Sequence, residues 1–367
     1  MSVKKLLSIT LAILIVIACF AGCAESGPTL TDKLVLKDID EPASIHSALQ
    51  TTFLTGGRDE ALKTARGSDE LSQPNGVNLS WENNLEGECE GYTLLVSENS
   101  DLSDAKTYET KRTVQNVINL KVATEYYWQV SAKIGEKTYQ SEIKSFKTED
   151  LAPRNLYVLG VTNARDLGGY KTSDGGRVKQ GMLYRCGRLN DDSSGTVTVQ
   201  DKGISVMLDD LKIKSEIDLR LEKGAKNHET SALGEKVSYF FIPMESDTFH
   251  IVEDNAGQVA KVFEVLGKEE NYPIVFHCSI GTDRTGAIAF MVNALLGVEK
   301  EDLYNDYLFS NFARITNRRD PSAADKYYAS ISAAQGKDFA EKTYNYLLNL
   351  GVKKEDLDNT IRILKQK

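Results

Sequence analysis

The chain has 367 residues, of which 41% are hydrophobic and 26% are charged, so it is long enough for two or three folded domains of ordinary composition. Its formal net charge is −9. This acidic balance excludes a general nucleic-acid binder, because contacts with a phosphate backbone need a surplus of lysine and arginine. Any anion site in this chain must therefore be a local one.

Residues 1–22 have the pattern of a signal peptide, with Lys4 and Lys5 before an apolar run and small residues before Cys23. The apolar run is short for a membrane span, which needs roughly 20 residues. The residues Phe-Ala-Gly-Cys resemble a bacterial lipobox, although Phe20 replaces the usual leucine. The resemblance implies export and a lipid on Cys23, which would anchor the protein to the outer face of a bacterial cell membrane. Cleavage near Ala24 without lipid, or an uncleaved anchor, are the alternatives.

The five cysteines, at positions 19, 23, 89, 186 and 278, do not predict a disulfide framework. Removal of the signal and lipidation of Cys23 leave three, an odd number for an exported chain. No Cys-x-x-Cys pair or His/Cys cluster with zinc spacing occurs. We therefore expect at least one free thiol and no metal or other cofactor.

Residues 23–74 read as a tether followed by a segment without a clear pattern. From 75 to 150 the chain has short alternating runs separated by turns, which predicts an all-β sandwich. This part resembles a fibronectin type III domain, with Trp81 on an early strand and Leu120, Tyr126, Trp128 and Val130 facing inward. The resemblance implies a spacer or docking module that contacts another protein.

Residues 151–367 alternate between strand-like and helical patterns, which predicts an α/β domain with a central sheet flanked by helices. The expected strands lie within 181–189, 215–221, 237–244 and 273–278. The expected helices lie within 257–268, 285–298 and 337–352, the last ending at Gly351.

The stretch His-Cys-Ser-Ile-Gly-Thr-Asp-Arg-Thr-Gly, residues 277–286, joins an expected buried strand to an expected helix. Strand ends that face helix N-termini are where α/β sheets bind ligands. Successive backbone N–H groups of a tight loop, together with the helix dipole, form a cradle for an oxyanion. The residues expected to bind the substrate there are Ser279, Ile280, Gly281, Thr282 and Gly286.

A cysteine at the centre of such a cradle becomes a thiolate, because the surrounding dipoles favour its anion. Cys278 would attack the phosphorus of a bound phosphate monoester, and Arg284 would hold two phosphate oxygens. Thr285 would donate a hydrogen bond to the sulfur. Separately, a buried cysteine and a surface arginine have ordinary structural explanations, but packing does not explain their combination at this junction.

The same ten residues resemble the phosphate loop of the cysteine-dependent tyrosine and dual-specificity phosphatases. The segments TNARDLGGYKTSDGGRVKQGMLYRCGRL, SEIDLR, DYLFSN and YLLNLGV resemble the bacterial secreted tyrosine-phosphatase family over residues 155–365. The resemblance implies a phosphatase with Cys278 as nucleophile, Arg284 as phosphate clamp and residues 279–284 as the oxyanion cradle.

Three residues depart from the family pattern. Thr282 stands where a lysine is usual, which weakens the case for highly charged phosphoinositides. Cys186 replaces a serine, and it either fills that site as a small residue or pairs with Cys278. Ile280 makes the floor of the pocket more apolar than usual.

The general acid is Asp247 or Asp283, because related phosphatases draw it from a loop about 30 residues before the cysteine, and this subfamily also carries an aspartate inside the loop. Asp247 lies 31 residues before Cys278 with Glu245 as its neighbour, and a solvated loop carboxylate is the alternative for it. Glu253 and Asp254 are weaker candidates. Arg185 and Asp166 match family positions that line or brace the pocket, and a structural salt bridge is the alternative for both. His277 is expected to order the loop.

The sequence therefore predicts a cysteine-dependent protein tyrosine phosphatase, or a dual-specificity one, that acts through a phosphocysteine intermediate. One alternative is a surface protein that binds phosphorylated ligands with little turnover. The other is an inositol-phosphate or phosphoinositide phosphatase, which would need a basic pocket. Arg314, Arg318 and Arg319 could supply that charge, but the sequence does not place them.

Overall fold

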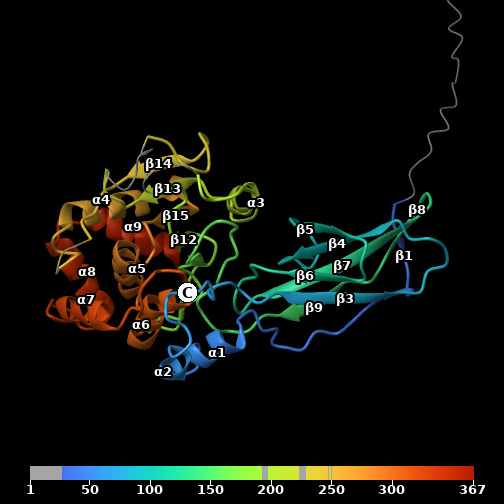
Figure 1. Ribbon diagram of the computed structural model, residues 1–367, viewed down its shortest axis with the longest axis horizontal. Helices are drawn as coiled ribbons and strands as arrows, with labels where there is room; N and C mark the ends of the chain where they lie inside the picture. The colour runs from blue at the N-terminus through green and yellow to red at the C-terminus, as the bar shows by residue number, and fades with distance from the viewer. Residues whose placement is uncertain (1–26, 192–196, 223–228, 247, 249) are drawn as a thin grey trace, which may run out of the picture.

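The structure, a computed structural model, describes residues 27–191, 197–222, 229–246, 248 and 250–367. Figure 1 shows an elongated molecule, with strands β1 to β9 at one end and a larger unit of helices around a sheet at the other. The predicted signal peptide and Cys23 lie outside the described residues. Within the described ranges, no helix is long and apolar enough to cross a membrane.

The N-terminal β unit consists of two sheets that share one core. One sheet has the order β1-β8-β7-β4-β5, with β9 also paired to β7, and the other has the order β2-β3-β6. The strands are β1 (Thr29–Leu30), β2 (Leu34–Leu36), β3 (Val77–Asn83), β4 (Gly91–Ser97), β5 (Lys106–Thr110), β6 (Val114–Val117), β7 (Glu125–Ile134), β8 (Lys137–Gln140) and β9 (Lys144–Lys147).

The core of the β unit follows from the alternation of side chains along its strands. Tyr126, Trp128 and Val130 alternate along β7 and are all buried, and Trp81 of β3 packs against them from the other sheet. These aromatic residues are core residues, which agrees with the inward direction expected from the sequence.

The C-terminal unit is built on a sheet of order β10-β12-β15-β13-β14, in which β12, β15, β13 and β14 are parallel and β10 is antiparallel. Its strands are β10 (Arg165–Asp166), β12 (Leu183–Cys186), β13 (Ser215–Asp218), β14 (Ser238–Phe241) and β15 (Ile274–His277). A separate pair joins β11 (Arg177–Val178) to β16 (Lys365–Gln366). The predicted α/β unit with a central sheet is confirmed.

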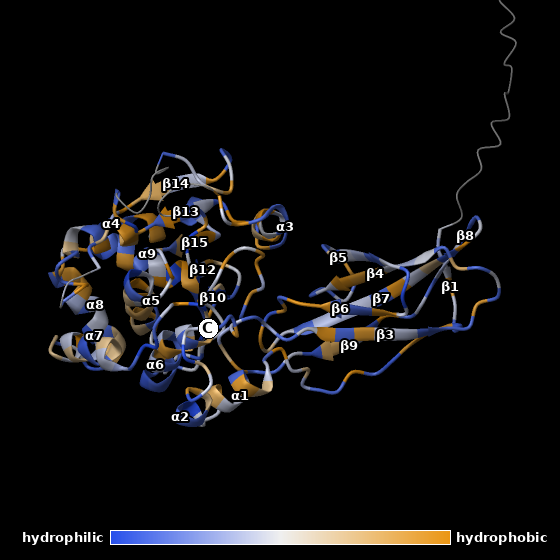
Figure 2. Ribbon diagram, in the orientation of Figure 1, coloured by the Kyte–Doolittle hydropathy of each residue, from blue (hydrophilic) through white to orange (hydrophobic). Residues whose placement is uncertain are grey.

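Both faces of this sheet are covered. Leu183, Ile274 and Phe276 belong to the large core on one face, while Tyr184 and Val275 belong to a smaller core on the other. Figure 2 shows hydrophobic residues, in orange, in the interior of this unit around β15. The helices are α3 (Asp201–Ser205) with the π turn η1 (Val206–Asp210), α4 (Ala256–Leu266), η3 (Glu269–Asn271), α5 (Asp283–Leu296), α6 (Lys300–Phe309), η4 (Ser310–Phe312), α7 (Ser322–Ser332), α8 (Phe339–Asn349) and α9 (Lys354–Leu364).

Helix α5 is the central helix of the unit. From Arg284 to Leu296 every residue is buried, which is why its sequence is apolar on all sides instead of on one stripe. It ends at Gly297, whose φ of 89° is the left-handed conformation common after helices. Because α5 is buried along its length, its first turn has a fixed position at the carboxyl end of β15.

Two short helices between β2 and β3, α1 (Ala48–Leu54) and α2 (Arg58–Ala61), pack on the C-terminal unit. Figure 1 shows them, in blue, beside α6. Phe53 contacts the rings of Phe309 and Phe312 edge-on, and Arg58 donates to Asn305 of α6 over 2.7 Å. The segment that the sequence left unassigned therefore supplies part of the core of the C-terminal unit.

Several hydrogen bonds join the two units. The side-chain amide of Gln180 accepts from the backbone N–H of Val122 and donates to its carbonyl, each over 2.9 Å. Arg154 donates to the carbonyl of Asn119 over 2.6 Å and to Asp166 over 3.1 Å. These contacts fix the β unit against β10, at one edge of the central sheet.

Candidate active site

The loop of residues 278–284, called here the Cys278 loop, turns from the carboxyl end of β15 into the first turn of α5. Gly281 has a φ of 73°, and a Cβ at this position would lie 2.4 Å from the carbonyl oxygen of Cys186. Only glycine fits this left-handed turn beside a neighbouring strand. The N–H groups of residues 279–282 donate no hydrogen bond to a described residue. Such a cluster of unpaired donors at a helix start is suited to an oxyanion.

Side-chain donors hold the backbone carbonyl groups of the Cys278 loop. The side-chain amide of Asn163 donates to the carbonyl oxygens of Ile280 and Gly281, each over 3.1 Å, and Arg185 donates to the Gly281 carbonyl over 2.7 Å. Because these donors hold the carbonyl groups on the outer side, the N–H groups are left for the inside of the loop. Gly286 starts α5 close against the ring of Tyr307, leaving room for no larger residue without movement.

Asp306 of α6 anchors this bracing. Its carboxylate accepts from Arg165 over 2.9 Å and from Arg185, and all three side chains are buried. Burial would raise the pKa of Asp306, but the two arginines outweigh it and the net shift is downward. Burial and the neighbouring Arg165 lower the pKa of Arg185 to about 10, which leaves the guanidinium charged at neutral pH.

Cys278 is 1% exposed and its thiol is free. Burial would raise the pKa of this thiol, but the charge of Arg284 and the neighbouring hydroxyl and backbone N–H of Thr285 outweigh burial and the opposing charge of Asp283. The net pKa is lowered. A thiolate is therefore favoured at the centre of the cradle, and a thiolate is the nucleophilic form of cysteine.

Arg284 lies close enough to this thiol for its charge to act on it. Its guanidinium makes only long contacts, to the carbonyls of Leu219 (3.3 Å) and Met244 (3.4 Å) and to the hydroxyl of Ser279 (3.4 Å). Its Nε is buried and has no hydrogen-bond partner in the described part of the chain. A planar donor group with unused hydrogen-bonding capacity is suited to binding two oxygens of a phosphate.

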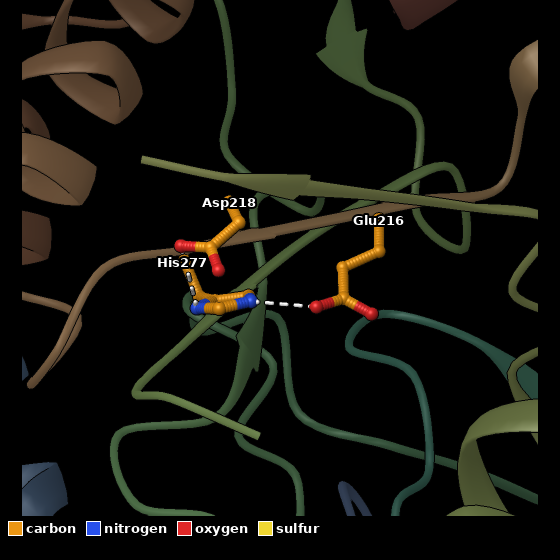
Figure 3. A group of neighbouring side chains, drawn as sticks. All are labelled: Glu216, Asp218 and His277. Atoms are coloured by element: carbon orange, nitrogen blue, oxygen red, sulfur yellow. Dashed lines mark hydrogen bonds and ion pairs between the residues drawn. The ribbon is translucent and has the colours of Figure 1, made fainter. Parts of the chain in front are cut away.

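A buried network of charges lies under the first residue of the loop (Figure 3). His277 Nε2 lies 2.9 Å from the carboxylate of Glu216, and Nδ1 lies 3.2 Å from the carbonyl of Cys278 and 3.9 Å from Asp218. Burial would lower the pKa of His277, but Asp218 and Glu216 outweigh it and raise the pKa. A protonated ring can donate to both acceptors, so His277 fixes the position of the Cys278 carbonyl.

The same three side chains have the composition of a metal site, but their ligand atoms already have partners in the protein. Asp218 accepts from Arg220 over 2.6 Å and from the hydroxyl of Tyr239 over 2.9 Å. Glu216 accepts from Ser231 as well as from His277. We read the group as a charge-balanced support for the Cys278 loop.

Comparison with known proteins identifies this arrangement. A profile of the tyrosine phosphatase family matches residues 156–367, which is more than half of the chain. The chain belongs to the tyrosine phosphatase family.

Among individual relatives, a Cupriavidus necator protein, whose name assigns it provisionally to the tyrosine-protein phosphatases, is 29% identical over 175 residues. The match covers 41% of this chain and 61% of that protein. A tyrosine-protein phosphatase of Nostoc commune is 36% identical over 53 residues, 14% of this chain and 18% of the relative. The solved structure of P. aeruginosa TpbA has 18% identity and a TM-score of 0.31, covering 48% of this chain and 90% of that one.

Of the residues predicted for the phosphatase site, Cys278, Ser279, Ile280, Gly281, Thr282, Arg284, Thr285 and Gly286 lie together at the strand–loop–helix junction. Arg185, expected among the substrate contacts, lies fully buried under the loop in a bracing position. Asp166 pairs with Arg154 between the two units and does not enter the pocket.

The structure describes only one of the two candidates for the general acid. Asp247 lies outside the described residues. Asp283 is held by Arg319, with two contacts of 3.0 Å between the guanidinium and both carboxylate oxygens. Both carboxylate oxygens of Asp283 are therefore occupied by one guanidinium, and neither is free to face a leaving group while this ion pair persists.

Asn163, Arg165 and Asp306 brace the phosphatase loop, and none of them was predicted to do so. The signal was present for Asn163 and Arg165, since both belong to the Asn-Ala-Arg-Asp segment that carried the family resemblance. Asp306, 22 residues beyond Arg284, opens the Asp-Tyr-Leu-Phe-Ser-Asn segment that also carried the resemblance, but nothing in that segment indicated its partners.

The proposed pairing of Cys186 with Cys278 has no support in the geometry. Both thiols are free, and they belong to the cores on opposite faces of the phosphatase sheet. Burial, with the charges of Glu216 and Cys278, raises the pKa of Cys186 well above its ordinary value. Cys186 therefore fits a small buried residue better than a reactive thiol.

Proposed function

We propose that this protein is a cysteine-dependent protein tyrosine phosphatase. The observation that carries the proposal is the Cys278 thiol, with its lowered pKa, at the base of a loop whose N–H groups and Arg284 are free to bind a phosphate. Family membership supports the same reaction. The chain spans 61% of the length of its curated C. necator relative, so activity and substrate are inferred from this site.

The chemistry has two steps. The thiolate of Cys278 attacks phosphorus, an S–P bond forms, and the P–O bond to the leaving alcohol or phenol breaks while a general acid supplies a proton. Water then attacks the phosphocysteine, the S–P bond breaks, and inorganic phosphate leaves with the thiolate restored. Throughout, the loop N–H groups and Arg284 stabilise the negative charge on the equatorial oxygens, and Thr285 stabilises the departing sulfur.

We further propose that the protein is exported and held by a lipid on Cys23 at the outer face of a bacterial membrane. The basic residues, apolar run and Phe-Ala-Gly-Cys of the N-terminus support this. The two sheets of the β unit, with their shared core, support a fibronectin III-like module that contacts another protein.

The first experiment measures phosphate release from phosphotyrosine and phosphoserine peptides and from inositol phosphates, using the chain from Ala24 onward with Cys278→Ser as the control. We expect metal-independent hydrolysis of phosphotyrosine that disappears in the variant. Hydrolysis of phosphoserine as well would assign dual specificity, and preference for inositol phosphates would replace the proposed substrate. Binding without turnover would leave a phospho-ligand-binding protein.

The general acid is tested by comparing Asp247→Asn with Asp283→Asn. Because Arg319 contacts both carboxylate oxygens of Asp283, we propose Asp247 as the proton donor. Asp247→Asn should lower kcat and flatten the pH dependence of turnover. An unchanged profile for Asp247→Asn, with a flattened one for Asp283→Asn, would move the role into the Cys278 loop.

A further inference from the structure

A pocket of about 570 Å³ opens beside the Cys278 loop, on the side of Ser279 and Ile280. Ser279 joins it to the phosphate cradle, because its hydroxyl also lies 3.4 Å from the Arg284 guanidinium. The pocket is called here the side pocket. The remaining lining comes from residues 157–162, Arg188, Thr198, Arg314 and Thr316, and from Glu70 and Gln73.

The side pocket carries more positive than negative charge, in a protein whose net charge is −9. Arg314 is exposed, and its guanidinium forms no ion pair with a described residue. Arg188 keeps a side-chain exposure of 39%, with the carboxylate of Asp191 at 3.8 Å. Among the described residues that line the pocket only Glu70 is acidic, and both its oxygens are engaged by neighbouring donors.

Residues that precede the region matched by the family profile position the segment around Arg314. Glu70 accepts from the hydroxyl of Thr162 and, over 3.4 Å, from the backbone N–H of Arg314. Gly67 donates to the carbonyl of Asn311 over 2.8 Å and accepts from the N–H of Ile315 over 2.9 Å. The family match begins at residue 156, so one wall of the side pocket belongs to the N-terminal segment.

The opposite wall is partly apolar. Tyr157, Leu159 and Val161 line the pocket and are only half-buried. Apolar contact next to two arginines matches a peptide chain with an acidic side chain. It matches a bare polyol phosphate less well, since that ligand has little apolar surface to bury.

We propose that the side pocket binds an acidic side chain that flanks the phosphorylated residue of a peptide substrate. The proposal rests on the proposed function, since the phosphate of the same peptide occupies the Cys278 loop. Arg314 and Arg188 bind the flanking carboxylate, and the N-terminal segment sets the position of Arg314.

The test compares two phosphotyrosine peptides that differ only in glutamate or glutamine at the positions flanking the phosphotyrosine. The wild-type chain should hydrolyse the glutamate peptide with a kcat/KM at least about 10-fold higher, since a hydrogen bond to a charged group contributes that much. Arg314→Ala and the double variant with Arg188→Ala should remove this preference, mainly through KM. Arg318→Ala is the matched control, because Arg318 is exposed on the same segment but does not line the pocket.

The outcomes separate this proposal from the proposed function. Hydrolysis of both peptides at one rate, or a preference that persists in the double variant, would overturn the proposed role of the side pocket. The proposed phosphatase activity would still stand. A failure to hydrolyse any peptide would overturn the phosphatase, and calorimetric binding of the same peptides to Cys278→Ser would then decide the side pocket. Stronger arginine-dependent binding of an inositol bisphosphate than of either peptide would overturn the peptide assignment.

Discussion

At the scale of single residues, the reactivity of Cys278 depends on charges and donors within one turn of the chain. Arg284 and Thr285 lower the pKa of the thiol against the opposite effect of burial. A lowered pKa keeps the thiolate present at pH values where an ordinary thiol, with a pKa of about 8.5, is protonated.

The first prediction follows from the lowered pKa of the Cys278 thiol. Alkylation of Cys278 by iodoacetamide, followed by mass spectrometry across a pH series, should show a midpoint below that of a small-molecule thiol measured alongside. Thr285→Ala should raise the midpoint, because it removes a donor to the thiolate. A midpoint equal to that of the free thiol would contradict the electrostatic account of the site.

The positions of Cys278 and Arg284 were predictable from the sequence because their geometry is local. Five residues separate Cys278 from Arg284, and one strand, one turn and one helix start determine where both lie. For Arg185 the sequence left two alternatives, a substrate contact and a structural salt bridge. Its arginine invites a substrate contact, and only the packing of β12 beside β15 and α6 buries it under the loop.

At the scale of elements, the Cys278 loop depends on a strand and a segment far from it in the chain. Asn163 has a φ of 59°, a conformation that asparagine and glycine adopt more readily than other residues. Asn163→Gly keeps this backbone conformation while removing the donors to Ile280 and Gly281.

We therefore predict that Asn163→Gly lowers kcat of the phosphatase by about 10- to 100-fold, the usual cost of a small misplacement of a catalytic group. KM should change less, because Arg284 remains. Steady-state kinetics would measure both, with Asn163→Asp as a matched variant that keeps the size and backbone conformation but cannot donate. Unchanged kcat in both variants would show that the loop holds its shape without Asn163.

Helix α1 contributes to the core of the C-terminal unit mainly through Phe53, which is 1% exposed and contacts two aromatic rings. Phe53→Ala should reduce the free energy of unfolding by about 3–5 kcal/mol, the range for truncating a buried aromatic residue. Chemical denaturation would measure this. Leu30→Ala, at a residue that is 60% exposed, is the control, and equal small effects would contradict the assigned packing.

The sequence did not reveal α1 because seven residues are too few to establish a helical period. One local signal was present. Ser47 and Gln50 form a capping box, in which each side chain bonds the backbone N–H of the other. The apolar residues of the segment gave no indication of their partner, because Phe309 and Phe312 lie more than 250 positions further along the chain.

At the scale of the whole molecule, the chain passes between the two units more than once. Strands β1 and β2 belong to the β unit, α1 and α2 pack on the C-terminal unit, and β3 returns to the β unit. Gln50 marks the crossing: it donates to the carbonyls of Leu71 and Gln73 and accepts from Asn155 over 3.3 Å. Residues 71–73, which precede β3, and Asn155, which follows β9, therefore lie close together around Gln50.

This path predicts that a chain beginning at Leu151, close to the start of the family match, is less stable than the chain from Ala24 onward. It would lose Phe53, Ala61, Leu62 and Ala65 and leave their apolar partners exposed to water. A second shortened chain, residues 46–75 joined to 151–367 by a short glycine–serine linker, keeps that cover and removes most of the β unit. We expect the second chain to have the higher thermal midpoint and to retain more phosphatase activity, because the helices and the Glu70 wall remain in place. If both shortened chains unfolded at the same temperature, the N-terminal segment would be an appendage, and the stability of the C-terminal unit would come from residues 151–367 alone.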